Sequence, residues 1–115
     1  MFVFGSNTAG MHVAGASKQA RRYGAKPGRG IGLVGGRTYA IPTKDDDLDV
    51  LPLETIAAYV DRFRKFTREY PKIKFFVTRI GCGLSRYRDA DIAPLFKGCG
   101  DNCSFAYEWR PYLEN

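Results

Sequence analysis

A chain of 115 residues with 44% hydrophobic and 26% charged residues has the length and balance of one folded domain, residues 1–115, which excludes two ordinary domains and a disordered chain. The formal net charge of +6 favours an anionic partner, which is a phosphate-bearing small molecule, a nucleic acid or an acidic protein. An odd number of cysteines, three, does not suit a disulfide framework and fits a reducing compartment. The sequence has neither an apolar run long enough to span a bilayer nor a signal-peptide pattern. We therefore expect a cytoplasmic protein without a membrane partner.

The first elements expected are a strand, a loop and a helix. Phe2–Phe4 is a short apolar run typical of a buried strand, and the small, turn-forming residues 5–10 follow it. Gly15–Tyr23 has its apolar residues at helical spacing, and Gly24 is a typical stop signal.

A glycine-rich connection and a second strand come next. Residues 28–36 contain five glycines and predict a mobile or tightly turned segment. Thr38–Ile41 is then expected to be a strand that Pro42 ends.

The second half begins with the strongest helical pattern of the chain. Apolar residues recur at steps of three and four from Leu53 to Phe66, with Pro52 suited to the first helical turn and Pro71 closing the helix.

Three shorter elements complete the chain. Ile73–Ile80 is rich in β-branched and aromatic residues and predicts a strand, Asp89–Phe96 a short helix, and Cys103–Tyr107 a last strand. Strands that alternate with helices indicate a compact α/β fold with a mostly parallel sheet flanked by helices, because parallel neighbours need crossover connections.

Three of the expected strands end in small or polar residues: Gly5-Ser6-Asn7, Pro42-Thr43-Lys44 and Gly81-Cys82-Gly83. Ligands of parallel sheets bind outside the carboxyl ends of the strands. We therefore expect Asn7, Thr43 and Gly83 to lie at one edge of the sheet, around a shared pocket.

Two glycine patterns resemble nucleotide-binding motifs only in part. The loop from Gly5 to His12 has the glycine spacing of a phosphate loop but lacks its lysine, which excludes an ATP-hydrolysing P-loop and leaves either backbone phosphate binding or a tight structural turn. Gly30–Gly35 matches the dinucleotide fingerprint as a string, but it precedes a strand, so a Rossmann site is excluded and a flexible wall over a pocket is left.

Candidates for catalysis and metal binding have simpler structural explanations. Cys82 would need a base such as His12 to act as a nucleophile, and a packed turn residue is favoured. Zinc is not favoured, because Cys99 and Cys103 would need two distant ligands, and Asp45–Asp47 is interpreted as a solvated turn rather than a base or a metal site. No catalytic residue, metal ligand or cofactor is assigned.

Arginines flank the last glycine turn. Arg79 and Arg86 are either plain surface charges or ligands of phosphate oxygens, and their place beside a glycine turn at a strand end favours binding, with Tyr87 stacking on a base or ribose. The predicted ligand-binding set comprises Gly5, Ser6, Asn7, His12, Thr43, Lys44, Arg79, Gly81, Cys82, Gly83, Leu84, Ser85, Arg86 and Tyr87.

The order of these motifs resembles a family. A Gly-Ser-Asn loop after the first strand, a Tyr-Ala-Ile-Pro-Thr-Lys strand and the run Val-Thr-Arg-Ile-Gly-Cys-Gly-Leu look like the small phage-associated "non-structural" proteins that are similar to macro domains. The resemblance implies a macro-like three-layer sandwich that binds ADP-ribose or a relative. It places Asn7 near the distal ribose and wraps Gly81–Ser85 around the diphosphate, although this chain lacks an unbroken glycine run after Asn7.

The function expected is binding, and hence sequestration, of an ADP-ribose-like or cyclic nucleotide signal, which in a phage would counter a host immune messenger. The alternative is hydrolysis of an ADP-ribosyl bond, with Asn7, His12 or Asp45 positioning water. A nucleic-acid partner is less favoured, because no RNA-binding aromatic motif or recognition helix stands out. A second copy of the chain is a candidate for completing the pocket.

Overall fold

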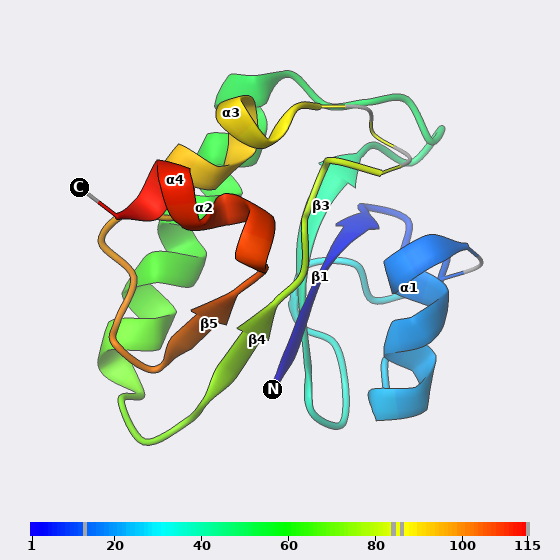
Figure 1. The fold of residues 1–115 in the computed structure, drawn as a ribbon. Helices are drawn as coiled ribbons and strands as arrows, with labels where there is room; N and C mark the ends of the chain where they lie inside the picture. The colour runs from blue at the N-terminus through cyan, green and yellow to red at the C-terminus, as the bar shows by residue number, and fades with distance from the viewer. Residues whose placement is uncertain (13, 84, 86, 115) are drawn as a thin grey trace.

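Five strands form one mixed sheet in the computed structural model, which describes residues 1–12, 14–83, 85 and 87–114 (Figure 1). The strands are β1 (Phe2–Asn7), β2 (Gly32–Leu33), β3 (Thr38–Lys44), β4 (Phe75–Val77) and β5 (Cys103–Phe105). Their order is β2-β3-β1-β4-β5, and only β2 runs antiparallel to its neighbour. The predicted α/β fold with a mostly parallel sheet is confirmed.

Helices lie on both faces of this sheet. They are α1 (Gly15–Ala20), α2 (Leu53–Glu69), α3 (Asp89–Ile92) and α4 (Arg110–Leu113), with 3₁₀ turns at Arg21–Tyr23, Ala93–Phe96 and Tyr107–Trp109. Within the described part of the chain, no helix has the length and apolar character needed to cross a membrane.

The larger core lies between the sheet and α2. Ile56, Val60 and Phe63 are fully buried at steps of three and four, so that one stripe of the helix faces the sheet. The Phe63 ring meets the Phe75 ring of β4 edge to face, with 5.5 Å between centroids. Fully burying each such side chain contributes about 1.5–3 kcal/mol, which makes this face the main source of stability.

The smaller core lies on the α1 face. Phe4, Ala20 and Ala40 are buried there together with Ala25 and Val34. In Figure 1, α1 stands beside β1, on the side of the sheet away from β4 and β5. One face of the sheet is therefore only partly covered.

Strand β3 continues past the proline that was expected to end it. Pro42 lies opposite Ser6, and the β1–β3 ladder shifts its register between Ser6 and Asn7. Proline has no N–H to donate to a regular ladder and is found at such irregularities. The strand thus reaches Lys44.

Strand β4 is shorter than Ile73–Ile80. The Thr78 backbone N–H and the Thr78 hydroxyl both donate to the Val3 carbonyl, at 3.1 and 2.8 Å. The next residues turn away from β1, with the Ile80 N–H donating to the Thr78 carbonyl at 2.7 Å. The early end of β4 leaves a gap in the sheet beside the second half of β1.

The remaining differences are small. Residues 32–33 of the glycine-rich segment form strand β2, which was not predicted, and β5 ends at Phe105 because a 3₁₀ turn begins at Tyr107. The stop at Gly24 is confirmed by its left-handed φ of 100°.

Candidate functional site

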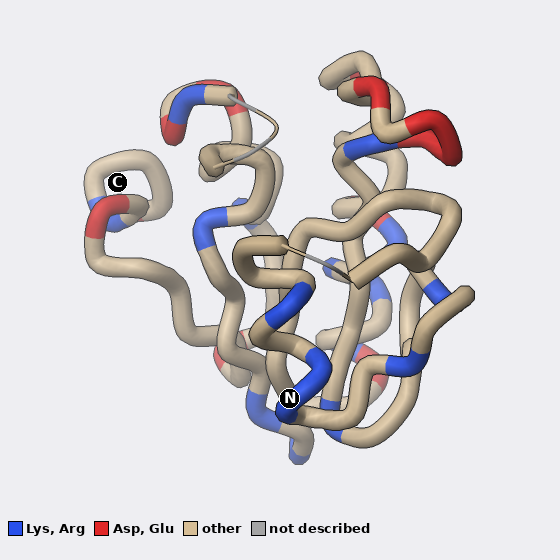
Figure 2. The backbone as a smooth tube through the Cα atoms, turned by 90° about the vertical axis from the view of Figure 1, so that its right-hand side faces the viewer, with Lys and Arg blue, Asp and Glu red and all other residues tan. Residues whose placement is uncertain are grey.

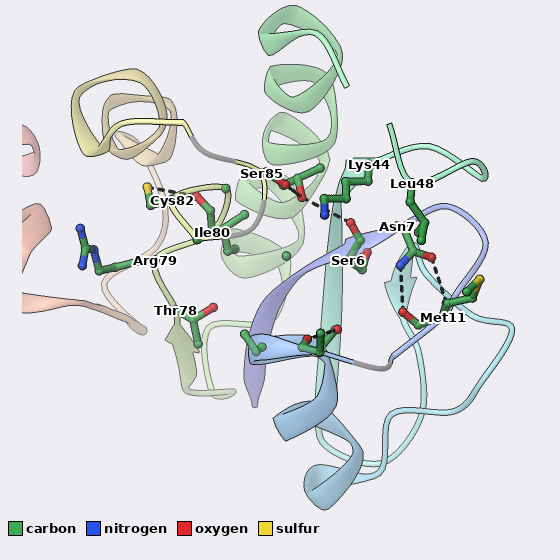
Figure 3. A pocket seen from close by; sticks show the side chains of 18 residues that line it. Ser6, Asn7, Met11, Lys44, Leu48, Thr78, Arg79, Ile80, Cys82 and Ser85 are labelled. Atoms are coloured by element: carbon green, nitrogen blue, oxygen red, sulfur yellow. Dashed lines mark hydrogen bonds between the residues drawn. The ribbon is translucent and has the colours of Figure 1, made fainter. Parts of the chain in front are cut away.

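A cavity of about 590 Å³ lies at the carboxyl ends of β1, β3 and β4 (Figure 3). Its lining comes from four stretches of chain: Gly5–Asn7 with Met11, Ala14–Ser17, Thr43–Lys44 with Leu48, and Thr78–Gly83 with Ser85. The structure therefore brings Asn7, Thr43 and Gly83 together around one cavity.

The topology of the sheet explains why a cavity opens at this place. The chain leaves β1 toward the face that carries α1, whereas the segment after β4 packs on the face that carries α2. Connections that diverge to opposite faces leave a crevice between the two strand ends. Strand β4 ends at Val77 while β1 continues to Asn7, so no strand of the sheet lies beside the second half of β1 on that side. This gap widens the crevice into a cavity.

Three hydroxyl groups join the strand ends across the cavity floor. The Thr43 and Ser85 hydroxyl oxygens lie 2.7 Å apart, and Thr43 Oγ1 donates to the Ser6 carbonyl at 3.4 Å. The Ser6 hydroxyl donates to the Gly30 carbonyl. All three residues are buried, so the floor is a connected polar network and not a set of mobile side chains.

Asn7 holds the loop that follows β1. Its Nδ2 donates to the Met11 carbonyl at 2.8 Å, and its Oδ1 accepts the Met11 N–H at 2.9 Å. An amide has two N–H donors and two acceptor lone pairs, so one of each remains for a ligand. Asn7 thus fixes the conformation of the cavity wall and still has one donor and one acceptor for a bound molecule.

His12 has a structural place. Its Nε2 lies 3.1 Å from the Lys26 carbonyl and 2.9 Å from the Arg29 carbonyl, so this nitrogen carries the proton and donates to both. The residue is 3% exposed, and Nδ1 is buried without a hydrogen-bond partner among the described residues. His12 ties two loops together and is not part of the lining described for the cavity, in contrast to its predicted ligand-binding role.

Arg79 lines the cavity but is held by carboxylates. Its guanidinium donates to both oxygens of Asp89, at 3.1 and 2.7 Å, and to Glu108 at 3.4 Å. Asp89 also accepts the indole N–H of the fully buried Trp109 at 2.8 Å. Hydrogen bonds from Arg79 lower the pKa of Asp89 below its usual value, so this carboxylate stays charged and much of the Arg79 charge is already neutralised.

Cys82 is a thiol at neutral pH. Burial, and then the neighbouring Asp89 carboxylate, raise the pKa of Cys82 to about 12. Its Sγ lies 3.5 Å from the Ile80 carbonyl, to which the thiol donates. A thiol that does not ionise is a poor nucleophile, in agreement with the packed role predicted for Cys82.

The glycine turn after β4 has one strained and one open position. Gly81 has a φ of 78°, which favours glycine, and its carbonyl accepts the Tyr87 N–H at 2.7 Å. Gly83 has open space where a Cβ would stand. The Tyr87 hydroxyl donates to the Leu51 carbonyl at 2.6 Å, so Tyr87 anchors the turn and lies outside the cavity lining. The predicted contacts of Leu84 and Arg86 lie outside the described residues.

Lys44 stands on the opposite side of the cavity from Arg79 (Figure 3). The structure shows no ion pair between Lys44 and a carboxylate of the described residues. The acidic run beyond Lys44 is a turn, because Asp45 Oδ1 accepts the backbone N–H groups of Asp47 and Asp49 at 2.9 and 3.0 Å. Carboxylate oxygens of Asp45, Asp47 and Asp49 lie within 4.8 Å of one another.

Part of the lining was not predicted from the sequence. Met11, Leu48, Thr78 and the start of α1 reach the cavity only through the packing of their loops. The small residues Gly15-Ala16-Ser17 are the one local signal, since small side chains allow a close approach.

In comparisons with known proteins, no family model, no curated protein and no solved structure matches the chain.

Proposed function

We propose that the chain binds a small phosphate-containing nucleotide derivative, ADP-ribose or a cyclic relative, in the cavity at the ends of β1, β3 and β4. We also propose that the α/β fold is a macro-like one. Binding without conversion would sequester a signalling nucleotide, such as an immune messenger of a phage's host.

The observation that carries the proposal is the convergence of three distant strand ends on one cavity. A volume of about 590 Å³ lies within the range of small-molecule and cofactor sites. The position at a divergence of connections is the usual ligand position in open α/β sheets.

The polar groups of the lining suit a nucleotide. The floor hydroxyls have donated their protons within the protein, so their oxygens can accept hydrogen bonds from ribose hydroxyls. The remaining N–H of Asn7 can donate to a ribose or phosphate oxygen. The described residues contain no hydrogen-bond acceptor for the Gly83 N–H, which leaves this backbone donor to a bound oxygen. Lys44 supplies a positive charge on one side, and Arg79 a largely neutralised one on the other.

Hydrolysis of an ADP-ribosyl bond is the second function that the sequence left open. Its three candidate residues have other hydrogen bonds here: Asn7 to Met11, His12 to two loop carbonyls, and Asp45 to its own turn. These hydrogen bonds define no position for an activated water, so they favour binding over hydrolysis.

Titration calorimetry of the wild-type chain with ADP-ribose and with cyclic ADP-ribose tests the proposal. We expect binding of at least one of them at a stoichiometry of one per chain. Lys44→Ala should weaken it about ten-fold or more, because a charge-assisted hydrogen bond contributes about 1.5–3 kcal/mol. Lys44 is partly buried, whereas Lys97 is exposed and lies outside the lining, so Lys97→Ala is the control for loss of one lysine charge.

The bound molecule is then recovered by denaturing the protein and is weighed by mass spectrometry. Intact ligand supports sequestration, whereas a hydrolysed product would make the protein an enzyme. Failure to bind either compound would overturn the proposed ligand class. Gel filtration of the wild type at two concentrations shows whether a second copy accompanies binding.

A further inference from the structure

The positive charge of the chain is concentrated in its first part. Residues 1–44 contain seven of the 18 lysines and arginines and none of the 12 aspartates and glutamates. The other residues contain 11 basic and 12 acidic side chains, so the net charge of +6 arises entirely from the first 44 residues.

These residues build β1, α1, β2 and β3, and of their lysines and arginines Lys44 is the one found in the cavity lining described above. Figure 2 shows Lys and Arg on α1 and over the lower half of the molecule, while the acidic turn after β3 lies at the top. Lys18, Arg21 and Arg22 line a shallow depression of about 600 Å³ beside α1. All three are exposed, and none pairs with a carboxylate that the structure describes.

Two more cations adjoin the N-terminus. The Arg37 N–H donates to the Tyr23 carbonyl at 2.9 Å, and the Met1 ammonium donates to the Lys74 carbonyl. Burial, and then the nearby Arg37 charge, lower the pKa of the Met1 ammonium. We call the exposed side chains of Lys18, Arg21, Arg22, Arg37 and Lys74 the basic face.

An aromatic row lies beside the basic face. Phe2 of β1 pairs in register with Phe76 of β4, so their side chains leave the same face of the sheet. The Tyr23 ring stacks on the Phe2 ring at 4.7 Å with an angle of 8° between their planes. Phe76 is 61% exposed and Tyr23 38% exposed, on the face of the sheet that α1 covers only in part.

We propose that the basic face and the aromatic row together bind single-stranded nucleic acid. A positively charged surface follows the phosphates of a strand, and aromatic rings on a sheet stack on unpaired bases. An acidic protein would also satisfy the charges, but the aromatic rings beside them favour a strand whose unpaired bases can stack on them. A duplex would hide its bases from that ring.

No sequence motif reveals this surface, because Phe2, Tyr23 and Phe76 come from three distant segments. The expectation that nucleic acid is the less favoured partner rested on the absence of a local aromatic motif. Charged side chains of the basic face are not among the residues that line the nucleotide cavity, so this proposal does not depend on the proposed function.

Fluorescence anisotropy of labelled 12-nucleotide single strands, dT and rU, tests the proposal at several salt concentrations. We expect binding that weakens with salt. Arg21→Glu/Arg22→Glu should weaken it at least ten-fold and reduce the log–log salt slope by about 1.4, since each phosphate neutralised on a single strand contributes about 0.7. Phe76→Ala should weaken binding about five-fold or more through lost stacking, while Phe76→Trp should retain it.

The matched control is Arg62→Glu/Arg68→Glu on α2, which changes the net charge equally at two exposed arginines that form no ion pair with a described carboxylate. It should change the affinity less than three-fold. Equal losses in the two charge-reversed proteins would reduce the binding to non-specific attraction and overturn the assignment. An equal affinity for a duplex, or binding to phosphatidylserine vesicles but not to single strands, would also overturn it.

Discussion

Two glycine-bearing regions look alike in the sequence and differ in what surrounds them. A Cβ built on Gly30 would lie 1.9 Å from the Asn7 carbonyl oxygen, and one built on Gly10 would lie 2.3 Å from the backbone nitrogen of Arg29. A Cβ built on Gly83 would meet no atom of the described residues within 4 Å. Glycine in the first region allows two loops to touch, whereas at Gly83 it leaves the surface open.

The first region therefore supports the fold, and the second is available to a ligand. The contact of residues 7–10 with residues 28–30 holds the end of β1 in place, together with the His12 hydrogen bonds. The Gly81–Gly83 turn needs glycine for its backbone only at Gly81, where φ is positive. Substitutions in the two regions should separate stability from binding.

The largest effect is expected for Gly30→Ala. The new methyl group would collide with the Asn7 carbonyl, and the two loops would have to move apart, at a cost of about 3 kcal/mol or more. Urea unfolding measures the loss. Gly28→Ala is the matched control, because it adds the same methyl in open space at a φ of 84° and should cost only about 1–2 kcal/mol of backbone strain. Equal losses in the two variants would contradict the steric argument.

A smaller effect is expected for Asp89→Ala, at the base of the open turn. The buried Trp109 indole N–H would lose its acceptor, at a cost of about 1–3 kcal/mol near pH 7. The folded-state pKa of Asp89 is lowered from its usual 3.8, so its contribution is present above that pH and is lost as the pH falls through the lower folded-state value. The stability difference between wild type and variant should narrow below pH 3.8 in urea titrations, and a difference independent of pH would refute a charged contribution.

Gly83→Val should change binding and leave stability alone. A Cβ at this position meets no atom of the residues that the structure describes, so the unfolding free energy should stay within about 0.5 kcal/mol of the wild type. It would project at the cavity lining and should reduce nucleotide binding at least ten-fold in calorimetry. Wild-type affinity in this folded variant would move the phosphate site elsewhere.

The smallest effect is expected for Cys82→Ala. Because the pKa of Cys82 is raised to about 12, the wild-type thiol should react slowly with iodoacetamide at pH 7.5. The variant should bind nucleotide as the wild type does. Rapid alkylation of Cys82 in the folded protein would contradict the packed role that its surroundings indicate.

The sequence by itself determined the elements whose signals are local. The spacing of apolar residues between Leu53 and Phe66 predicted α2, because a helix places residues three and four apart on one stripe. Short apolar runs followed by small or polar residues predicted β1 and the residues Asn7, Thr43 and Gly83 that share the cavity, since the ends of parallel strands meet at one edge. The ends of β3 and β4 themselves differ from the prediction.

The tertiary structure decided everything that depends on contacts between distant segments. The Thr78 N–H and hydroxyl fasten the end of β4 to the Val3 carbonyl of β1, and the carbonyls of Lys26 and Arg29 give His12 a structural role. Tyr23, Phe2 and Phe76 form one row only after the sheet is assembled. A sequence pattern indicates which side of a helix or strand faces the core. It does not indicate which distant residue forms a hydrogen bond with a given polar group, because that pairing depends on how the elements pack.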